Sequence, residues 1–227
     1  MDQVKIIKDI IKKKQTNICL AADVETVENL FKLIEQVGDK ICILKIHYDI
    51  IEDFFLDYYH TSSKLRDYKK KYNFLIWEDS KFGDIGYILI KKISNHIIKW
   101  ADLISIHPIG GIMSVNQIKG IGIILIGELS CQDHLINLEY QNKVIEISEK
   151  CDNIVGIVCQ HKMTDNLLNI TPGISLNKKI DNLGQQYSSP EDKLFSDIFV
   201  IGRDIYLDKN PKNKLDKILN KQKKNIL

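Results

Sequence analysis

Three charged residues stand close together in one segment of the chain: Asp79, Lys81 and Asp84 fall within six positions. Opposite charges within a few ångströms favour the ionised form of each group. A lysine between aspartates is therefore expected to remain an ammonium ion, able to stabilise an anion or to donate a proton. A Schiff-base lysine would instead need an apolar pocket that favours the neutral amine. The alternative is a surface ion-pair cluster, so the position of this segment in the fold matters.

The elements that must position these residues are short apolar runs that recur along the chain. Segments of helical period lie between most of them, such as Ile85, Ile88, Leu89, Ile93, Ile97 and Ile98. Alternating strands and helices predict a parallel sheet covered by helices, and near-continuous apolar strands indicate burial on both faces. Eight units in about 200 residues favour a single (β/α)8 TIM barrel domain over residues 1–227. The runs are NICLAA, KICILKI, NFLIW, DLISI, GIILIG, NIVGIV, NLLNI and DIFVI.

The first residues of the chain, MDQVKIIKDIIKKK, place Ile6, Ile7, Ile10 and Ile11 at helical spacing with lysines between them. A signal peptide would need an uninterrupted apolar stretch. The segment is therefore predicted to be an amphipathic helix.

Polar or turn-forming residues follow every apolar run. In a (β/α)8 barrel the carboxyl ends of the strands converge on one rim, where the active site lies. This convergence predicts a polar site built from distant parts of the sequence. Taken singly, Asp23 could cap a helix, and His107 is more simply a hydrogen-bonded barrel histidine. The residues at the strand ends are Asp23, Lys45, His47, Glu78, Asp79, Lys81, His107, Glu128, Ser130, Gln160, Thr171, Pro172, Gly202 and Arg203.

Composition narrows the class of partner. The chain has 227 residues, 32 basic and 30 acidic, so its formal charge of +2 gives no broad reason to expect nucleic acid or a membrane as partner. No apolar run approaches the ~20 residues that span a bilayer. The five cysteines form no CxxC pair and are expected to be buried, reduced thiols of a cytosolic protein. Cys131 and His134 lack a second ligand pair, so no metal site is predicted. The lysine-rich segment after Pro211 is predicted to be a solvated helix.

The segment Glu78–Gly86 resembles the hallmark of the orotidine 5′-phosphate decarboxylase family, Asp-x-Lys-x-x-Asp in an EDRKFADIG-like context. Further matches follow the family's order over nearly the whole chain: Ala22–Val24, Lys45–His47, Glu128–Cys131, Thr171–Gly173, Leu183–Tyr187 and Ile201–Arg203. The resemblance implies a cytoplasmic barrel enzyme without metal or cofactor. Its reaction would be the decarboxylation of orotidine 5′-monophosphate (OMP) to uridine 5′-monophosphate (UMP) in de novo pyrimidine biosynthesis.

Carried over position by position, the resemblance implies a charged catalytic array of Lys45, Asp79, Lys81 and Asp84. Lys81 would stabilise and protonate the carbanion at C6 of the pyrimidine. Asp84 would reach the neighbouring subunit's site in a homodimer with shared active sites. The implied substrate-binding residues are Asp23, Lys45 and His47 for the ribose, Ser130 for the pyrimidine, Gln185, Tyr187, Gly202 and Arg203 for the phosphate, and in addition Ile85 and Pro172.

Two features qualify the resemblance. The stretch 172–187 is polar and without clear period, which is typical either of a lid that closes over the phosphate or of a plain connection. Where the family usually has a threonine whose hydroxyl helps hold the ribose, this chain has Ile88.

Two other functions remain open from the sequence. One is a metal-dependent decarboxylase or aldolase acting on a sugar phosphate, because related barrels share the Asp-x-Lys-x-x-Asp pattern. The segment Leu183–Tyr187 favours the pyrimidine enzyme. The other is a non-catalytic nucleotide-binding barrel, and the retention of all four array residues argues against it.

Overall fold

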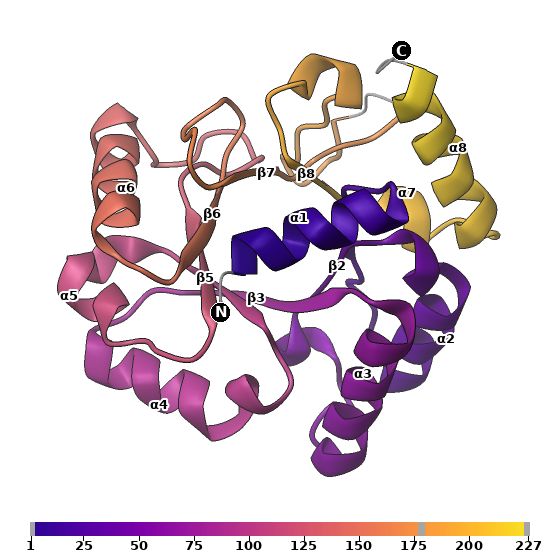
Figure 1. Cartoon of the computed structure of the whole chain (residues 1–227), viewed down its shortest axis with the longest axis horizontal. Helices are drawn as coiled ribbons and strands as arrows, with labels where there is room; N and C mark the ends of the chain where they lie inside the picture. Colours follow the sequence, from indigo (N-terminus) through magenta and orange to yellow (C-terminus); the bar gives the residue numbers. More distant parts are fainter. Residues whose placement is uncertain (1–2, 177–179, 225–227) are drawn as a thin grey trace.

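The computed structural model describes residues 3–176 and 180–224, and its centre is a closed barrel of eight parallel strands in chain order (Figure 1). Each predicted apolar run forms one strand, which confirms the (β/α)8 fold. The strands are β1 (Ile18–Ala21), β2 (Ile43–Ile46), β3 (Leu75–Phe82), β4 (Leu103–Ile106), β5 (Gly122–Ile126), β6 (Ile154–Val158), β7 (Leu168–Thr171) and β8 (Ile198–Ile201).

Helices surround the barrel, with two exceptions: residues 159–167 link β6 to β7 without one, and the described residues between β7 and β8 form only the 3-10 turn Pro190–Lys193. The α-helices are α1 (Gln3–Lys14), α2 (Val27–Val37), α3 (Tyr58–Tyr72), α4 (Gly86–His96), α5 (Gly111–Asn116), α6 (Leu138–Lys150), α7 (Arg203–Tyr206) and α8 (Pro211–Lys224). Short 3-10 turns are η1 (Gly38–Lys40), η2 (Tyr48–Ile50), η3 (Ile97–Lys99), η4 (Pro108–Gly110) and η5 (Pro190–Lys193). Within the described ranges, no helix has the length and apolarity needed to cross a membrane.

The apolar stripe predicted for the α4 region is narrower than expected. Leu89, Ile93 and Ile97 are buried, whereas Ile85 is 63% exposed and Ile98 is 39% exposed. Ile85 precedes the first turn of α4, and Ile98 lies in η3 after the helix has ended. Neither side chain therefore follows the face that the helical period defines.

The amphipathic N-terminal helix α1 lies across the amino ends of the strands and crosses the barrel in Figure 1. Ile7 and Ile10 are buried in the same apolar cluster as the inward-facing Cys19 and Ile43. At the end of the helix, Lys14 Nζ donates to the carbonyl oxygens of residues 38, 41 and 72, at 2.9, 2.6 and 2.7 Å. The helix thus closes the end of the barrel opposite the predicted site.

Alternation along the strands decides which side chains face the barrel interior. Ile43, Leu75, Trp77 and Leu103 belong to the interior cluster, whereas residues between them, such as Leu44 and Ile76, pack against the helices. Side chains two positions apart on a strand share a face. The interior face therefore continues into polar groups at the carboxyl ends, namely Lys45 after Ile43, Asp79 after Trp77 and Ser105 after Leu103.

Two further expectations concern cysteines and the final helix. All five cysteines are unpaired, and four are buried as predicted, but Cys131 is only half-buried because it follows β5 in a loop at the rim. In α8, Leu215 and Ile218 are buried while Lys212 and Lys217 are exposed, which confirms a helix with a solvated basic face.

Candidate active site

A pocket of about 280 Å³ opens at the carboxyl ends of the strands, on the predicted rim. Nine of the strand-end residues named from the sequence line it, and they come from six different strands or the loops that follow them. These nine are Asp23, Lys45, His47, Asp79, Lys81, Ser130, Pro172, Gly202 and Arg203, and Gln185 and Tyr187 line it as well.

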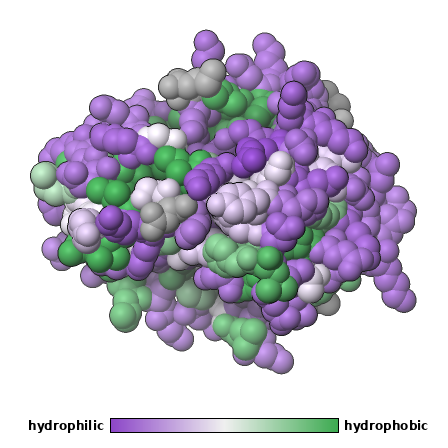
Figure 2. All heavy atoms as spheres, turned by 90° about the horizontal axis from the view of Figure 1, so that it is seen from below, coloured by the Kyte–Doolittle hydropathy of each residue, from purple (hydrophilic) through white to green (hydrophobic). Residues whose placement is uncertain are grey.

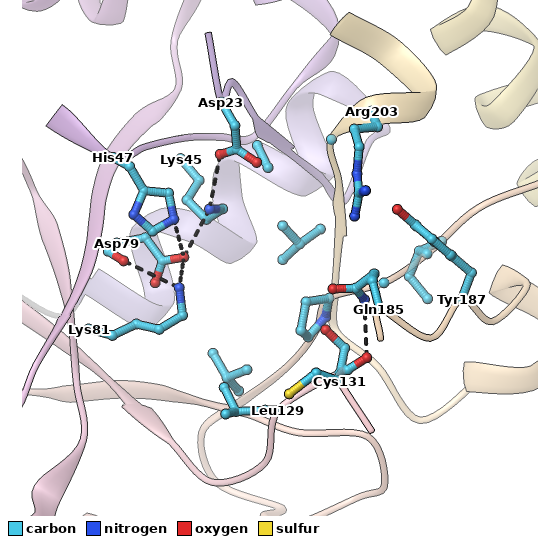
Figure 3. Close-up of a pocket in the computed structure, with 18 of the residues that line it drawn as sticks. Asp23, Lys45, His47, Asp79, Lys81, Leu129, Cys131, Gln185, Tyr187 and Arg203 are labelled. Atoms are coloured by element: carbon cyan, nitrogen blue, oxygen red, sulfur yellow. Dashed lines mark hydrogen bonds and ion pairs between the residues drawn. The ribbon is translucent and has the colours of Figure 1, made fainter. Parts of the chain in front are cut away.

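The carboxylate of Asp79 is the centre of the charged end of the pocket (Figure 3). Its Oδ2 lies 2.9 Å from Lys45 Nζ, 2.8 Å from Lys81 Nζ and 3.3 Å from His47 Nε2. Lys45 Nζ also approaches Asp23 Oδ1 at 3.5 Å. Lys45 and His47 point to the same side of the barrel, because residues two positions apart on an extended strand share a face. One buried carboxylate thus holds two ammonium groups at a fixed separation from it.

The charges of this group stabilise one another. Burial alone would raise the pKa of Asp79, but the Lys45 ammonium, the hydrogen bond to His47 and the Lys81 ammonium together hold that pKa well below its usual range. Burial alone would lower the pKa of Lys45, and the carboxylates of Asp79 and Asp23 raise it instead. Asp79 therefore stays an anion and Lys45 a cation at neutral pH.

Lys81 reaches the pocket from an irregular part of β3. The strand continues to Phe82, beyond the apolar run that predicted it, and its pairing with β4 shifts between Glu78 and Phe82. Lys81 has φ of +47°, in the left-handed region that costs a non-glycine residue of order 1 kcal/mol or more. Such a conformation is common at functional sites, where the surroundings hold it in place.

The opposite end of the pocket carries Arg203, Gln185 and Tyr187, across from the Asp79 group in Figure 3. The Arg203 guanidinium lies 5.5 Å from the centre of the Tyr187 ring. Gln185 Nε2 donates to the backbone oxygen of Ser130 at 3.2 Å, which joins the 180–187 loop to the loop after β5. A guanidinium and an amide at this end could bind an anionic group such as phosphate.

A comparison with protein families identifies the chain. The family model described as "Orotidine 5'-phosphate decarboxylase / HUMPS family" matches residues 16–218. The chain belongs to this family. It is 36% identical over 218 residues to the orotidine 5'-phosphate decarboxylase of Pachysolen tannophilus, covering 87% of this chain and 81% of that protein. The Saccharomyces cerevisiae protein of the same name is 35% identical with the same coverage. The uridine 5'-monophosphate synthase of Bos taurus is 35% identical over 216 residues, which is 88% of this chain but 44% of that protein.

Two of the predicted site residues, Asp84 and Ile85, lie outside the pocket. Asp84 accepts hydrogen bonds from Lys92 Nζ at 3.0 Å and from the Ile85 N–H at 2.9 Å, and both lower its pKa. Ile85 is largely exposed, and Ile88 is half-buried in α4 without lining the pocket. A single chain therefore brings together Lys45, Asp79 and Lys81, but neither Asp84 nor Ile85.

The other strand-end residues have local roles. His107 Nδ1 lies 3.4 Å from the Tyr140 hydroxyl, in keeping with a hydrogen-bonded barrel histidine. The Glu128 carboxylate accepts the Gln160 N–H at 3.1 Å. Within the part of the chain that the structure describes, no three His, Cys, Asp or Glu side chains gather in a way that could hold a metal ion.

Sequence reasoning missed the apolar and small residues of the pocket and one buried hydroxyl. Trp77, Leu129, Cys131, Ile174 and Val200 line the pocket, among others. The sequence could have identified Trp77 and Val200, because each lies two positions before a predicted site residue, Asp79 or Gly202, and therefore shares its face of the strand. The missed hydroxyl is that of Ser105, a polar residue at an inward position of β4.

Proposed function

We propose that this chain is a carboxy-lyase that decarboxylates OMP to UMP in de novo pyrimidine biosynthesis, with Lys81 as the group that stabilises and protonates C6. The observation that carries the proposal is the shared Asp79 carboxylate, which holds the ammonium groups of Lys45 and Lys81 in the pocket that ends at Arg203. Membership of the family and the names of the relatives point to the same reaction.

The chemistry needs a fixed positive charge. The bond between C6 and the carboxylate carbon breaks heterolytically, carbon dioxide leaves, and the electron pair remains on C6. No adjacent carbonyl delocalises this pair. A preorganised ammonium beside C6 stabilises the charge without having to reorient during the reaction. Lys81 then donates a proton to C6, which completes UMP, and the resulting neutral amine is reprotonated from solvent. All of this uses side chains of the protein and requires no metal or cofactor.

The same pocket has groups suited to the rest of the nucleotide. Asp23, Lys45 and His47 are proposed to bind the ribose hydroxyls, Ser130 the pyrimidine, and Pro172 to form part of the substrate-binding wall, because all of them line the pocket. At the far end, Gln185, Tyr187, Gly202 and Arg203 are proposed to bind the phosphate, because a planar guanidinium can contact two phosphate oxygens. Residues 177–179 of the predicted 172–187 lid lie outside the described residues. Binding of the phosphate is proposed to close the described parts, residues 172–176 and 180–187, and so to exclude water from the carbanion.

We also propose that two chains form a homodimer in which Asp84 and Ile85 complete the partner's site. Large apolar side chains are exposed beside Asp84, namely Ile85, Tyr87, Ile109 and Met113, each between 63% and 70% exposed. The patch combines residues 85–87 with residues 109–113. These two segments are close in space, since a Cβ added to Gly83 would lie 3.3 Å from the Ile109 side chain. Exposed apolar patches of this kind mark protein contacts.

The surface offers further support for assembly and for a cellular location. Figure 2 views the molecule from the side where α3 and α4 lie in Figure 1, and separate apolar patches appear there on a largely hydrophilic surface. The proposed location is the cytoplasm, because unpaired cysteines suit a reducing compartment.

A decarboxylation assay tests the function directly. The purified chain is incubated with OMP, with and without a metal chelator, and both UMP and carbon dioxide are quantified. We expect turnover that the chelator does not affect. Turnover that requires an added metal would favour the sugar-phosphate class of enzyme. Binding of UMP without release of carbon dioxide would leave a non-catalytic nucleotide-binding barrel.

A further inference from the structure

The strand that carries Asp79 and Lys81 bulges against its neighbour β4. Glu78 pairs with Ile104 and Phe82 pairs with Ile106, so residues 79–81 all stand opposite the single residue Ser105. A bulge of this kind interrupts the ladder of backbone hydrogen bonds and re-aims side chains, and bulges are frequent beside active sites. The backbone groups within the bulge therefore need other partners.

Ser105 supplies such a partner, and its hydroxyl makes two contacts at once. It donates to Asp79 Oδ1 at 2.6 Å, and it accepts the backbone N–H of Lys81 at 3.1 Å. Ser105 is fully buried and does not line the pocket. The Ser105 hydroxyl thus connects the Asp79 carboxylate to the backbone of Lys81, and that carboxylate also contacts the Lys81 ammonium.

The two oxygens of Asp79 have separate tasks. Oδ2 faces the pocket and contacts the ammonium groups of Lys45 and Lys81, whereas Oδ1 faces β4 and contacts Ser105. Without the contact at Oδ1 the carboxylate could rotate about its last side-chain bond, a torsion with a broad energy well. The N–H of Lys81, held in the left-handed region, would also lose its partner.

We infer that Ser105 is a positioning residue for the decarboxylation proposed above: it sets the orientation of the Asp79 carboxylate and the backbone of Lys81, and thereby the place of the Lys81 ammonium beside C6. The inference rests on that proposed function. Ser105 itself touches no substrate atom, so its effect is exerted through the two residues that it joins. Misplacement of a catalytic group by about 1 Å can lower a rate as much as a hundredfold where the reaction depends on preorganised charge.

The test compares Ser105→Ala with Ser105→Thr, which retains a hydroxyl. Ser105→Ala should lower kcat about ten- to hundredfold, the expected effect of losing a hydrogen bond to a charged group. The KM for OMP and the affinity for UMP should stay nearly unchanged, because no binding group has been removed. Ser105→Thr should recover most of the lost kcat. Ser148→Ala is the matched control, since Ser148 is a buried serine in α6 whose hydroxyl donates to the Ile145 carbonyl at 2.7 Å, away from the pocket.

The pH dependence of kcat separates positioning from general damage to the fold. Loss of a donor to Asp79 raises the pKa of that carboxyl, so the acid limb of the profile should move to higher pH in Ser105→Ala. If Ser105→Ala merely reduced the amount of folded protein, the molecules that do fold would keep the wild-type pH profile of kcat and the wild-type affinity for UMP. Wild-type kcat and an unchanged acid limb in folded Ser105→Ala would overturn the inference while leaving the decarboxylase function intact. Absence of turnover in the unmodified protein would overturn both.

Discussion

The guanidinium of Arg203 lies 2.5 Å from the carboxylate of Asp181, so the first residue of α7, just after β8, is tied to the 180–187 loop. Asp181 also accepts the backbone N–H groups of Leu183 at 2.8 Å and Gln185 at 2.9 Å. Burial alone would raise the pKa of Asp181, and these three partners lower it instead. Arg203 and the turn that carries Gln185 therefore form one connected unit at the proposed phosphate end.

Arg203→Ala should weaken the binding of OMP but leave binding of the phosphate-free nucleoside almost unchanged. A charged hydrogen bond contributes roughly 1.5–3 kcal/mol, so KM for OMP should rise about ten- to hundredfold. Steady-state kinetics with OMP and inhibition by UMP and uridine measure the difference. Arg66→Ala, on the exposed side of α3, is the control. Equal losses for nucleotide and nucleoside would contradict the phosphate assignment.

Lys81→Ala should abolish turnover with little effect on folding, because its ammonium is proposed both to stabilise and to protonate the carbanion. General acids alone contribute at least ~10²-fold, so kcat should fall below roughly a hundredth of the wild-type value. Circular dichroism and the unfolding midpoint check the fold. Lys143→Ala removes an exposed lysine of α6 and should retain full activity. A Lys81→Ala protein above that limit would show that another group protonates C6.

Mixing two inactive variants tests the shared site. Asp84 lies outside the pocket of its own chain and is proposed to complete the partner's site, whereas Lys81 acts in its own. Asp84→Asn and Lys81→Ala should therefore each be inactive alone. In a mixed dimer one of the two sites would contain both native residues, and activity should reappear on mixing. Native mass spectrometry verifies that subunits have exchanged. Exchange without any activity would place Asp84 in the site of its own subunit.

The fold followed from sequence because its signals are local and repeated. Each apolar run is short, both faces are buried, and the helical segments between runs have a clear period, so hydrophobicity alone marks the strands. The pocket residues at strand ends followed because a parallel barrel brings all carboxyl ends to one rim. The shared orientation of Lys45 and His47 is also a local property, because the two residues are two positions apart on an extended strand.

What sequence could not give was the detail of pairing between strands. Nothing in the run DLISI shows that Ser105 faces a bulge of three residues, because the shift depends on how β3 meets β4. The contact between Asp181 and Arg203 joins residues 22 positions apart across a loop of irregular conformation. The exposure of Ile85 was missed because helical period says nothing about the residue that precedes the first turn.

Glu78 lies beside the catalytic strand residues but faces away from the pocket, where it is fully buried. Its Oε1 accepts the Ser80 N–H at 3.0 Å and the Ser80 hydroxyl, whereas Oε2 has no partner among the described residues. Burial raises the pKa of Glu78 to about 7, although the hydrogen bonds from Ser80 oppose this rise. In the folded protein the Glu78 carboxyl is therefore mostly protonated below about pH 7.

Glu78→Gln should stabilise the protein at pH 8 and have much less effect near pH 4.5. A carboxyl whose pKa is higher in the folded state contributes stability that is complete below its unfolded pKa, about 4.5, and is lost as the pH rises through about 7. Glutamine can accept the same hydrogen bonds from Ser80 and carries no charge to bury. The free energy of unfolding of Glu78→Gln relative to wild type should thus rise by up to about 3 kcal/mol between pH 4.5 and pH 8. Chemical denaturation across this range measures it, with Glu139→Gln on the exposed face of α6 as the control. A difference that does not change with pH would mean that the pKa of Glu78 is the same in the folded and unfolded states.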